Sequence, residues 1–231
     1  MKIAVIVFPG SNCDHDAYFA FRKILEMDTA FVWHKETNLS PYDLIVLPGG
    51  FSYGDYLRCG AIARFSPVMK EVIAKAEKGA RILGICNGFQ ILTESGLLPG
   101  ALMRNMNRRF VCRDVHLKVI NSQTPFTHQC KKNEILRVPV AHGEGNYYCS
   151  TEVMEELKEN EQVVFRYCTP DGLENQEANP NGSIENIAGI INKEGNILGM
   201  MPHPERNAEH SIGNGDGRKI LQSLIVDFLR N

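Results

Sequence analysis

The sequence lacks the features that mark a membrane, secreted or nucleic-acid-binding protein. No apolar run reaches the roughly 18 residues that suggest a bilayer-spanning helix. The amino terminus enters a strand pattern at once, where a secretory leader would begin with charged residues. The formal net charge of −2 gives no general attraction for phosphate backbones or acidic membranes. We therefore expect a cytoplasmic protein that binds neither nucleic acid nor membrane.

The cysteines lack any paired spacing. All seven are spread along the chain, with no C-x-x-C pair and no zinc-type spacing. They stand at positions 13, 59, 86, 112, 130, 149 and 168. This pattern indicates reduced thiols, and the ordinary role of such a residue is that of a small buried hydrophobe. A cysteine proposed as a nucleophile therefore needs support from its own surroundings.

The chain also lacks internal repeats and low-complexity segments. Its 231 residues are 43% hydrophobic and 23% charged, close to the composition of ordinary globular proteins. A chain of this length can bury one substantial core without a second domain. We therefore expect one domain over residues 1–231.

Apolar strand patterns alternate with helical patterns in the first half of the chain. Residues 2–8 form a continuous apolar run that ends in Pro-Gly, and residues 43–47 and 80–85 repeat this signature, which is typical of strands buried on both faces of a parallel sheet. Helices are predicted after residue 12 or 14 and over 67–78, 88–96 and 216–230. The alternation predicts an α/β fold of flavodoxin type, with an open, mostly parallel sheet covered by helices on both faces.

The second half of the chain has more strand patterns and fewer helices. The candidate strands span 111–120, 135–141, 163–167, 187–192 and 197–201. We expect them to extend the same sheet. The turn-rich stretch 169–183 is predicted to be a surface loop, because strand patterns resume directly after it.

Cys86 is the one cysteine whose surroundings indicate chemistry. It is the centre of Gly84–Gly88, Gly-Ile-Cys-Asn-Gly, where a buried strand turns into a helix. This matches the G-x-nucleophile-x-G elbow, in which a sharp turn exposes the nucleophile and glycines let neighbouring segments pass closely. A helix amino terminus also favours a thiolate. The N–H of Asn87 would supply half of an oxyanion hole. The alternative is a core cysteine in a tight turn.

A thiol that attacks an amide also needs a proton shuttle, because the departing nitrogen must be protonated. Two histidines have a carboxylate two positions away, His142 with Glu144 and His203 with Glu205. Prolines on each side of His203 restrict its backbone, which suits a catalytic base. Glycines surround His142 and suit close approach to a ligand. We therefore assign proton transfer to His203 and pocket building to His142; a histidine that only bonds to its loop is the alternative for each.

Three motifs together resemble the class I glutamine amidotransferases. They are Pro48–Gly50, Gly84–Gln90 and Pro202–Glu205. The resemblance covers nearly the whole chain and implies a Cys-His-Glu triad of Cys86 as nucleophile, His203 as general base and acid, and Glu205 as its orienting carboxylate. It further implies that Gly50 and Asn87 supply oxyanion-hole N–H groups. Gln90 and the loop of His142, Gly143 and Glu144 look like glutamine-contacting elements.

Four further stretches resemble the glutaminase subunits of phosphoribosylformylglycinamidine synthases in particular. They are residues 49–58, 139–145, 179–183 and 200–206. One departure is Cys59, where alanine would be expected; a small buried side chain should be tolerated there. The resemblance implies that the chain hydrolyses glutamine through a cysteinyl thioester and passes the ammonia to a partner for ATP-dependent conversion of formylglycinamide ribonucleotide to formylglycinamidine ribonucleotide in purine biosynthesis.

No G-x-x-x-x-G-K-[ST] loop occurs in the chain. We therefore expect no cofactor here, with ATP and Mg used by a separate large synthetase subunit. The family implies such a subunit, together with a small third one. Arg104, Arg108, Arg109 and Arg113 form a basic cluster that could face the partner or a phosphate-bearing ligand, or be a solvated surface.

Two other functions compete with this interpretation. One is glutaminase activity for a different synthetase, such as those that make GMP, anthranilate or carbamoyl phosphate. The two interior motifs among these stretches argue against it. The other is a non-catalytic, flavodoxin-like redox sensor whose cysteine is oxidised. The histidine-carboxylate pair argues against a sensor, because oxidation of a thiol needs no such base.

Overall fold

Nine strands pair into one sheet in the computed structural model, which describes residues 1–211 and 213–230. In sheet order the strands are β2 (Asp28–Trp33), β1 (Lys2–Val7), β3 (Leu44–Leu47), β4 (Arg81–Ile85), β11 (Ile197–Met200), β10 (Ile187–Ile191), β9 (Val163–Cys168), β6 (Val111–Val119) and β7 (Ile135–His142). Neighbours from β2 to β11 are parallel and those from β11 to β7 are antiparallel. The predicted fold class is confirmed, and the second half of the chain does extend the same sheet.

The inner parallel strands β1 and β3 are part of the buried centre of the molecule. All four residues of β3, and Ile3 to Ile6 of β1, have 0% exposure. Their continuous apolar sequence is explained by cover on both faces, because neither face of these strands meets water. A small second sheet pairs β5 (Ala101–Met103) with β8 (Asn146–Tyr148).

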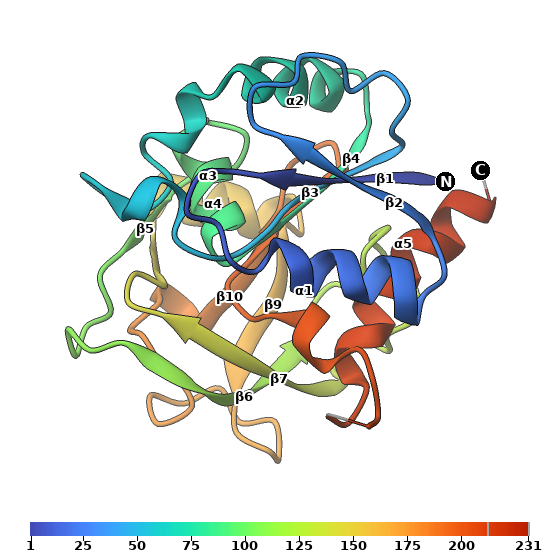
Figure 1. Ribbon diagram of the computed structural model, residues 1–231. Coiled ribbons are helices and arrows are strands. Elements are labelled where there is room, and N and C mark those ends of the chain that lie inside the picture. Colours follow the sequence, from blue (N-terminus) through green and yellow to red (C-terminus); the bar gives the residue numbers. More distant parts are fainter. Residues whose placement is uncertain (212, 231) are drawn as a thin grey trace.

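Helices lie on both faces of the parallel half. Figure 1 shows α1 (Asp14–Phe19) and α2 (Pro67–Glu77) on opposite sides of β1. Helix α1 continues into the π-helical turn η1 (Ala20–Ile24). The remaining helices are α3 (Asn87–Glu94), α4 (Thr151–Glu159) and α5 (Asp216–Arg230), with 3₁₀ turns η2 (Ser52–Asp55), η3 (Ala63–Phe65), η4 (Ile184–Asn186) and η5 (Pro204–Asn207). Among the described residues, no helix combines the length and apolar character needed to cross a membrane.

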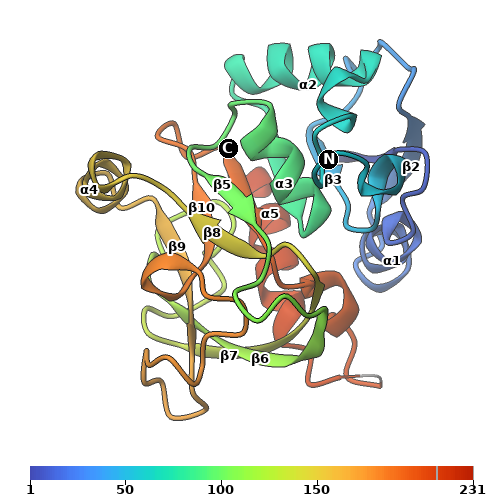
Figure 2. The same cartoon turned by 90° about the vertical axis from the view of Figure 1, so that its left-hand side faces the viewer.

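The antiparallel half stands apart from α1 and α2. Figure 2 shows β6, β7 and α4 well away from α1 and α2. The predicted loop between β9 and η4 is confirmed, because residues 169–183 contain neither helix nor strand. It is a surface loop only in part, since Asn181 and Ser183 are buried.

Strand register brings three strand ends to one edge of the sheet. Leu47 of β3 pairs with Gly84 of β4, and Ile85 pairs with Met200 of β11. Because these strands are parallel, their carboxyl ends meet at the same edge. The loops that follow them carry residues 49–50, 86 and 203, so the fold gathers the predicted site there.

Candidate active site

Cys86 stands at the turn between β4 and α3. Its backbone has φ 51° and ψ −105°. Residues other than glycine rarely adopt a positive φ. A Cβ on Gly88 would lie 1.9 Å from the carbonyl oxygen of Leu47, so only glycine lets α3 begin directly against β3. The strained, glycine-flanked turn is the geometry that the elbow pattern predicted.

His203 and Glu205 follow β11 and form a buried pair. His203 Nδ1 lies 2.7 Å from Glu205 Oε1, and the two side chains are 1% and 0% exposed. A carboxylate oxygen only accepts, so Nδ1 carries the hydrogen in this bond. The N–H of His203 donates to the Pro139 carbonyl at 2.8 Å. Hydrogen bonds therefore hold His203 both at its ring and at its backbone.

The triad residues converge over Gly49. A Cβ built on this glycine would lie 2.7 Å from Cε1 of His203 and 3.3 Å from Cβ of Cys86. The imidazole and the cysteine thus border one small space. A side chain at position 49 would fill this space, so glycine is required there. Nε2 of His203 has no hydrogen-bond partner among the described residues. It is the ring atom left for proton transfer with the cysteine.

Opposing effects act on the protonation of His203. Burial lowers the pKa of the imidazole, but the negative charges of Glu205 and Cys86 outweigh burial and raise this pKa to about 10. A protonated ring is thereby favoured beside the cysteine. This is the charge state in which a histidine can protonate the leaving group.

Two backbone donors are left for the predicted oxyanion hole. In the part of the chain that the structure describes, the N–H groups of Gly50 and Asn87 have no protein acceptor. Gly50 has φ +120°, and a Cβ there would lie 2.6 Å from the backbone nitrogen of Asn12. The Asn87 side chain is occupied elsewhere, since its Oδ1 accepts from Ser52 N–H at 3.2 Å. Asn87 is therefore placed to offer its backbone donor to a ligand.

A pocket of about 310 Å³ opens beside Cys86. Every residue predicted to contact glutamine lines it: Gln90, His142, Gly143 and Glu144. Gln90 Nε2 donates to the Glu144 carbonyl at 2.6 Å, and its Oε1 accepts from Asn87 Nδ2 at 2.9 Å. Gln90 therefore links the helix after the nucleophile to the loop on the opposite wall.

Charges of both signs line this pocket. Arg104, Arg108 and Arg109 of the basic cluster belong to the lining, together with Asp55 and Glu144. Arg104 Nε lies 3.6 Å from Glu144 Oε1. Arg113 lies on β6 and is not among the lining residues. Most of the basic cluster thus lines the pocket, with its side chains exposed to solvent.

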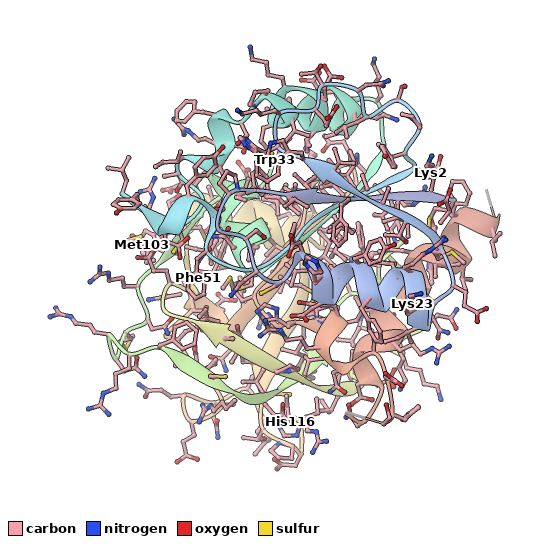
Figure 3. All side chains as sticks on the ribbon, in the orientation of Figure 1. Lys2, Lys23, Trp33, Phe51, Met103 and His116 are labelled. Carbon is pink, nitrogen blue, oxygen red and sulfur yellow. The ribbon has the colours of Figure 1, made fainter. Side chains whose placement is uncertain are left out.

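Aromatic residues border the same pocket. Phe51 and Phe110 are lining residues whose ring centroids are 6.4 Å apart. Figure 3 labels Phe51 left of the centre, well above His116, which lies on β6 at the bottom of the view. Cys59 also lines the pocket and is 9% exposed. Its N–H donates to Glu144 Oε2 at 3.3 Å, so cysteine is accommodated at this position.

Several residues near the site had no role in the sequence analysis. Arg206 Nη2 lies 3.0 Å from Cys13 Sγ, and its Nε donates to Asp16 at 2.9 Å. Cys13 is buried and close to the space above Gly49. Burial, which outweighs the charge of Arg206, raises the pKa of this thiol to about 12, so it stays neutral. Arg206 follows Glu205 directly, and that adjacency was the available signal.

Two buried asparagines were also missed. Asn105 and Asn181 are 1% and 2% exposed and contact the ring of His142 from either side. Asn181 lies in the stretch 179–183 that carried part of the resemblance, which was its signal. Asn105 stands among arginines, and nothing in its neighbours marks a buried amide.

Comparisons with known proteins identify the family of this chain. A family model described as a CobB/CobQ-like glutamine amidotransferase domain matches residues 1–217. The phosphoribosylformylglycinamidine synthase subunit PurQ of Moorella thermoacetica is 57% identical over 225 residues, which are 97% of this chain and 95% of that protein. The PurQ subunit of Gloeobacter violaceus is 56% identical over 229 residues, 99% of each chain.

A solved structure agrees along the whole chain. A chain in the structure of PurLQS from Thermotoga maritima superposes with a TM-score of 0.87 at 45% identity, and the match covers 98% of each chain. The likeness in sequence and fold thus extends far beyond the triad motifs. This chain belongs to the CobB/CobQ-like glutamine amidotransferase family and, within it, to the PurQ subunits of phosphoribosylformylglycinamidine synthase.

Proposed function

We propose that this protein hydrolyses glutamine and delivers the ammonia to a phosphoribosylformylglycinamidine synthase. The observation that carries the proposal is the convergence of Cys86, His203 and Glu205 beside one pocket, which Cys86 lines. A thiol, a buried imidazole and an orienting carboxylate are the groups that nucleophilic cleavage of an amide requires.

The first half of the reaction is acyl transfer to the cysteine. The Cys86 thiolate attacks the side-chain amide carbon of glutamine, and the oxyanion that forms is bound by the N–H groups of Gly50 and Asn87. His203, protonated at Nε2 and held by Glu205 at Nδ1, gives its proton to the departing nitrogen. Ammonia leaves, and a γ-glutamyl thioester remains on Cys86.

The second half is hydrolysis of that thioester. His203, now neutral, takes a proton from water as the water attacks the thioester carbon. Collapse of the second tetrahedral intermediate releases glutamate and restores the thiolate beside the imidazolium. The orientation by Glu205 serves both halves, because the same Nε2 first donates and then accepts a proton.

The pocket suits the rest of the glutamine molecule. Glutamine carries an ammonium and a carboxylate on its Cα, and the lining supplies the acidic side chains Asp55 and Glu144 and three arginines. Opposite charges on a partly enclosed wall interact more strongly than they would in water. This charge pattern favours a zwitterionic amino acid over a neutral amide.

The ammonia acceptor is expected on a separate chain. The Thermotoga maritima relative occurs in a structure of PurLQS, and we infer that this chain likewise assembles with a large synthetase subunit and a small third subunit. ATP and Mg would be used on the large subunit. We also infer a cytoplasmic location, in keeping with its seven free cysteines.

The competing functions have less support. The alignments with the PurQ relatives cover at least 97% of the chain, with 56% identity or more. This likeness argues for this synthetase over one that makes GMP, anthranilate or carbamoyl phosphate. A redox sensor would not need the His203–Glu205 pair, which is buried and bonded in the geometry that proton transfer uses.

Replacement of the nucleophile tests the proposal. Glutamate release from glutamine is measured for the wild type and for Cys86→Ala, each alone and with the synthetase and the third subunit. We expect the variant to lose all turnover and keep its fold, because only one small side chain is removed. Cys112→Ala, at an exposed cysteine on β6, is the matched control and should keep wild-type turnover. Glutamine hydrolysis by Cys86→Ala would reject the proposal.

A further inference from the structure

Asn105 is a buried amide in the middle of an exposed basic segment. Its relative exposure is 1%, whereas the neighbouring arginines at 104, 108 and 109 are exposed and line the pocket beside Cys86. A buried polar side chain costs free energy unless its donors and acceptors are all bonded. The partners of Asn105 therefore indicate what the residue does.

Every polar atom of this side chain contacts the walls of the pocket. Nδ2 donates to the carbonyl oxygens of Arg109 at 2.8 Å and His142 at 2.9 Å. Oδ1 accepts from the N–H of Gly145 at 2.9 Å and lies 3.1 Å from Nδ1 of His142. The backbone N–H of Asn105 adds a bond to the Gly143 carbonyl at 2.9 Å. One residue thus ties the arginine segment to the loop that carries Glu144.

A second asparagine completes the arrangement from the other side. Asn181 Nδ2 lies 3.4 Å from Nε2 of His142 and donates to the Gly145 carbonyl at 2.8 Å. Because Oδ1 of Asn105 only accepts and Nδ2 of Asn181 only donates, the ring between them is neutral with its hydrogen on Nδ1. The His142 imidazole is therefore fixed in rotation as well as position.

We propose that Asn105 is a positioning residue of the glutamine site, which holds the arginine segment 104–109 and the loop 142–145 at the separation that the substrate requires. The inference rests on the proposed function, since it concerns where glutamine binds. Asn105 does not line the pocket, and it acts through the two segments that do. Cys86, His203 and Glu205 lie outside its contacts, so it should control binding more than chemistry.

A purely structural role has a matched control in this chain. Asn196 is also buried, and its Nδ2 also donates to two backbone carbonyls, those of Ala76 and Ala80, each at 2.9 Å. It lies at the opposite edge of the sheet, just before β11 begins. Asn196→Ala should therefore cost stability through the same kind of lost bonds without moving the pocket.

The experiment compares Asn105→Asp, Asn105→Ser and Asn105→Ala with Asn196→Ala and the wild type in the assembled complex. Aspartate keeps the shape but presents an oxygen to the carbonyls of Arg109 and His142. We expect the glutamine KM to rise at least about tenfold in the Asn105 variants, while kcat changes less than about threefold. Asn196→Ala should keep the wild-type KM and kcat.

A second readout separates binding from nucleophile reactivity. Iodoacetamide alkylation is followed by mass spectrometry at the peptide that contains Cys86, because the exposed Cys112 also reacts. The rate without glutamine should match that of the wild type in all variants. Protection by glutamine should require about tenfold more glutamine in the Asn105 variants, in proportion to KM.

Three results would overturn the inference: an unchanged KM in folded Asn105 variants, an equal KM rise in Asn196→Ala, or failure of every Asn105 variant to fold, which would assign the residue to the folding core. These differ from a failure of the proposed function. In that case the wild type itself would not hydrolyse glutamine, and glutamine would not protect its Cys86.

Discussion

Glu205 is a carboxylate that water does not reach. Its side chain has 0% exposure, and Oε2 has no hydrogen-bond partner among the described residues. A buried negative charge persists only beside positive charge, and here the imidazolium of His203 supplies it at 2.7 Å. The adjacent guanidinium of Arg206 is a second positive charge that interacts with Glu205. The charge of Glu205 is one of the causes that raise the pKa of Arg206. The carboxylate therefore sets the protonation of His203 as well as its orientation.

Replacement of Glu205 by glutamine should separate these effects. Loss of the negative charge removes the main interaction that raises the pKa of His203 to about 10. The imidazolium, which must protonate the leaving nitrogen, then loses its proton at lower pH. We expect kcat to fall by about 10² to 10⁴ and the alkaline limb of kcat/KM to move to lower pH, measured from pH 6 to 11.

A control for this variant lies in the same segment. Glu209→Gln makes the same change of charge four residues away and should leave the rate and its pH profile unaltered. An alkaline limb that stays at the wild-type pH in Glu205→Gln would show that Glu205 does not set the protonation of His203.

At the scale of elements, the start of α3 depends on contact with β3. A Cβ on Gly88 would lie 1.9 Å from the carbonyl oxygen of Leu47, which is backbone in the centre of the sheet and cannot move aside. Helix α3 would have to shift away from β3 and carry the N–H of Asn87 with it. Gly88 is therefore needed both for the stability of the fold and for the position of the Asn87 N–H that would bind the oxyanion.

Gly88→Ala should therefore lower the free energy of unfolding by about 1–3 kcal/mol and reduce kcat more than it changes KM. Urea unfolding and glutaminase kinetics measure the two effects. Gly143→Ala is a fair stability control, because its Cβ would meet nothing closer than 3.8 Å. Wild-type stability in Gly88→Ala would mean that α3 can move without cost.

The sequence predicted the elements of the buried centre better than those of the rim. The strand around Ile45 is buried and apolar throughout, and the strand around Leu83 is buried after Arg81, so their pattern was unambiguous. Helix α4 was not predicted, because only Met154 and Leu157 are buried along Thr151–Glu159 and two residues make no stripe. The one local signal was Ser150, whose hydroxyl accepts from the N–H of Val153 at 3.3 Å as a helix cap.

At the scale of the whole molecule, the triad was predictable because each member follows a recognisable strand. Register then determined that the strand ends meet, through a parallel pairing of β4 with β11 that the strand-helix alternation of the first half did not imply. Pairing direction in the second half was not implied, since an apolar strand pattern looks the same in either direction. The contacts of Asn105 and Asn181 were hidden for a related reason: a buried asparagine has no local pattern.

Buried His142 links this pocket to the stability of the whole fold. Burial first, and the charge of His203 second, lower its pKa from an ordinary 6.5 to about 4. The unfolded chain therefore binds a proton more readily than the folded one between these values. The contribution to stability is complete above pH 6.5 and is lost as the pH falls through about 4.

We therefore expect the wild type to lose about 2 kcal/mol of unfolding free energy through this residue between pH 7.5 and pH 5. The glutamine in His142→Gln cannot bind a proton. The loss of unfolding free energy between pH 7.5 and pH 5 should therefore be about 2 kcal/mol smaller in this variant than in the wild type. Urea unfolding at the two pH values measures the difference, and the other histidines cancel because both proteins contain them. An identical pH dependence in the two proteins would mean that His142 binds a proton in the folded state as easily as in the unfolded chain, and that the ring held between Asn105 and Asn181 is not constrained to be neutral.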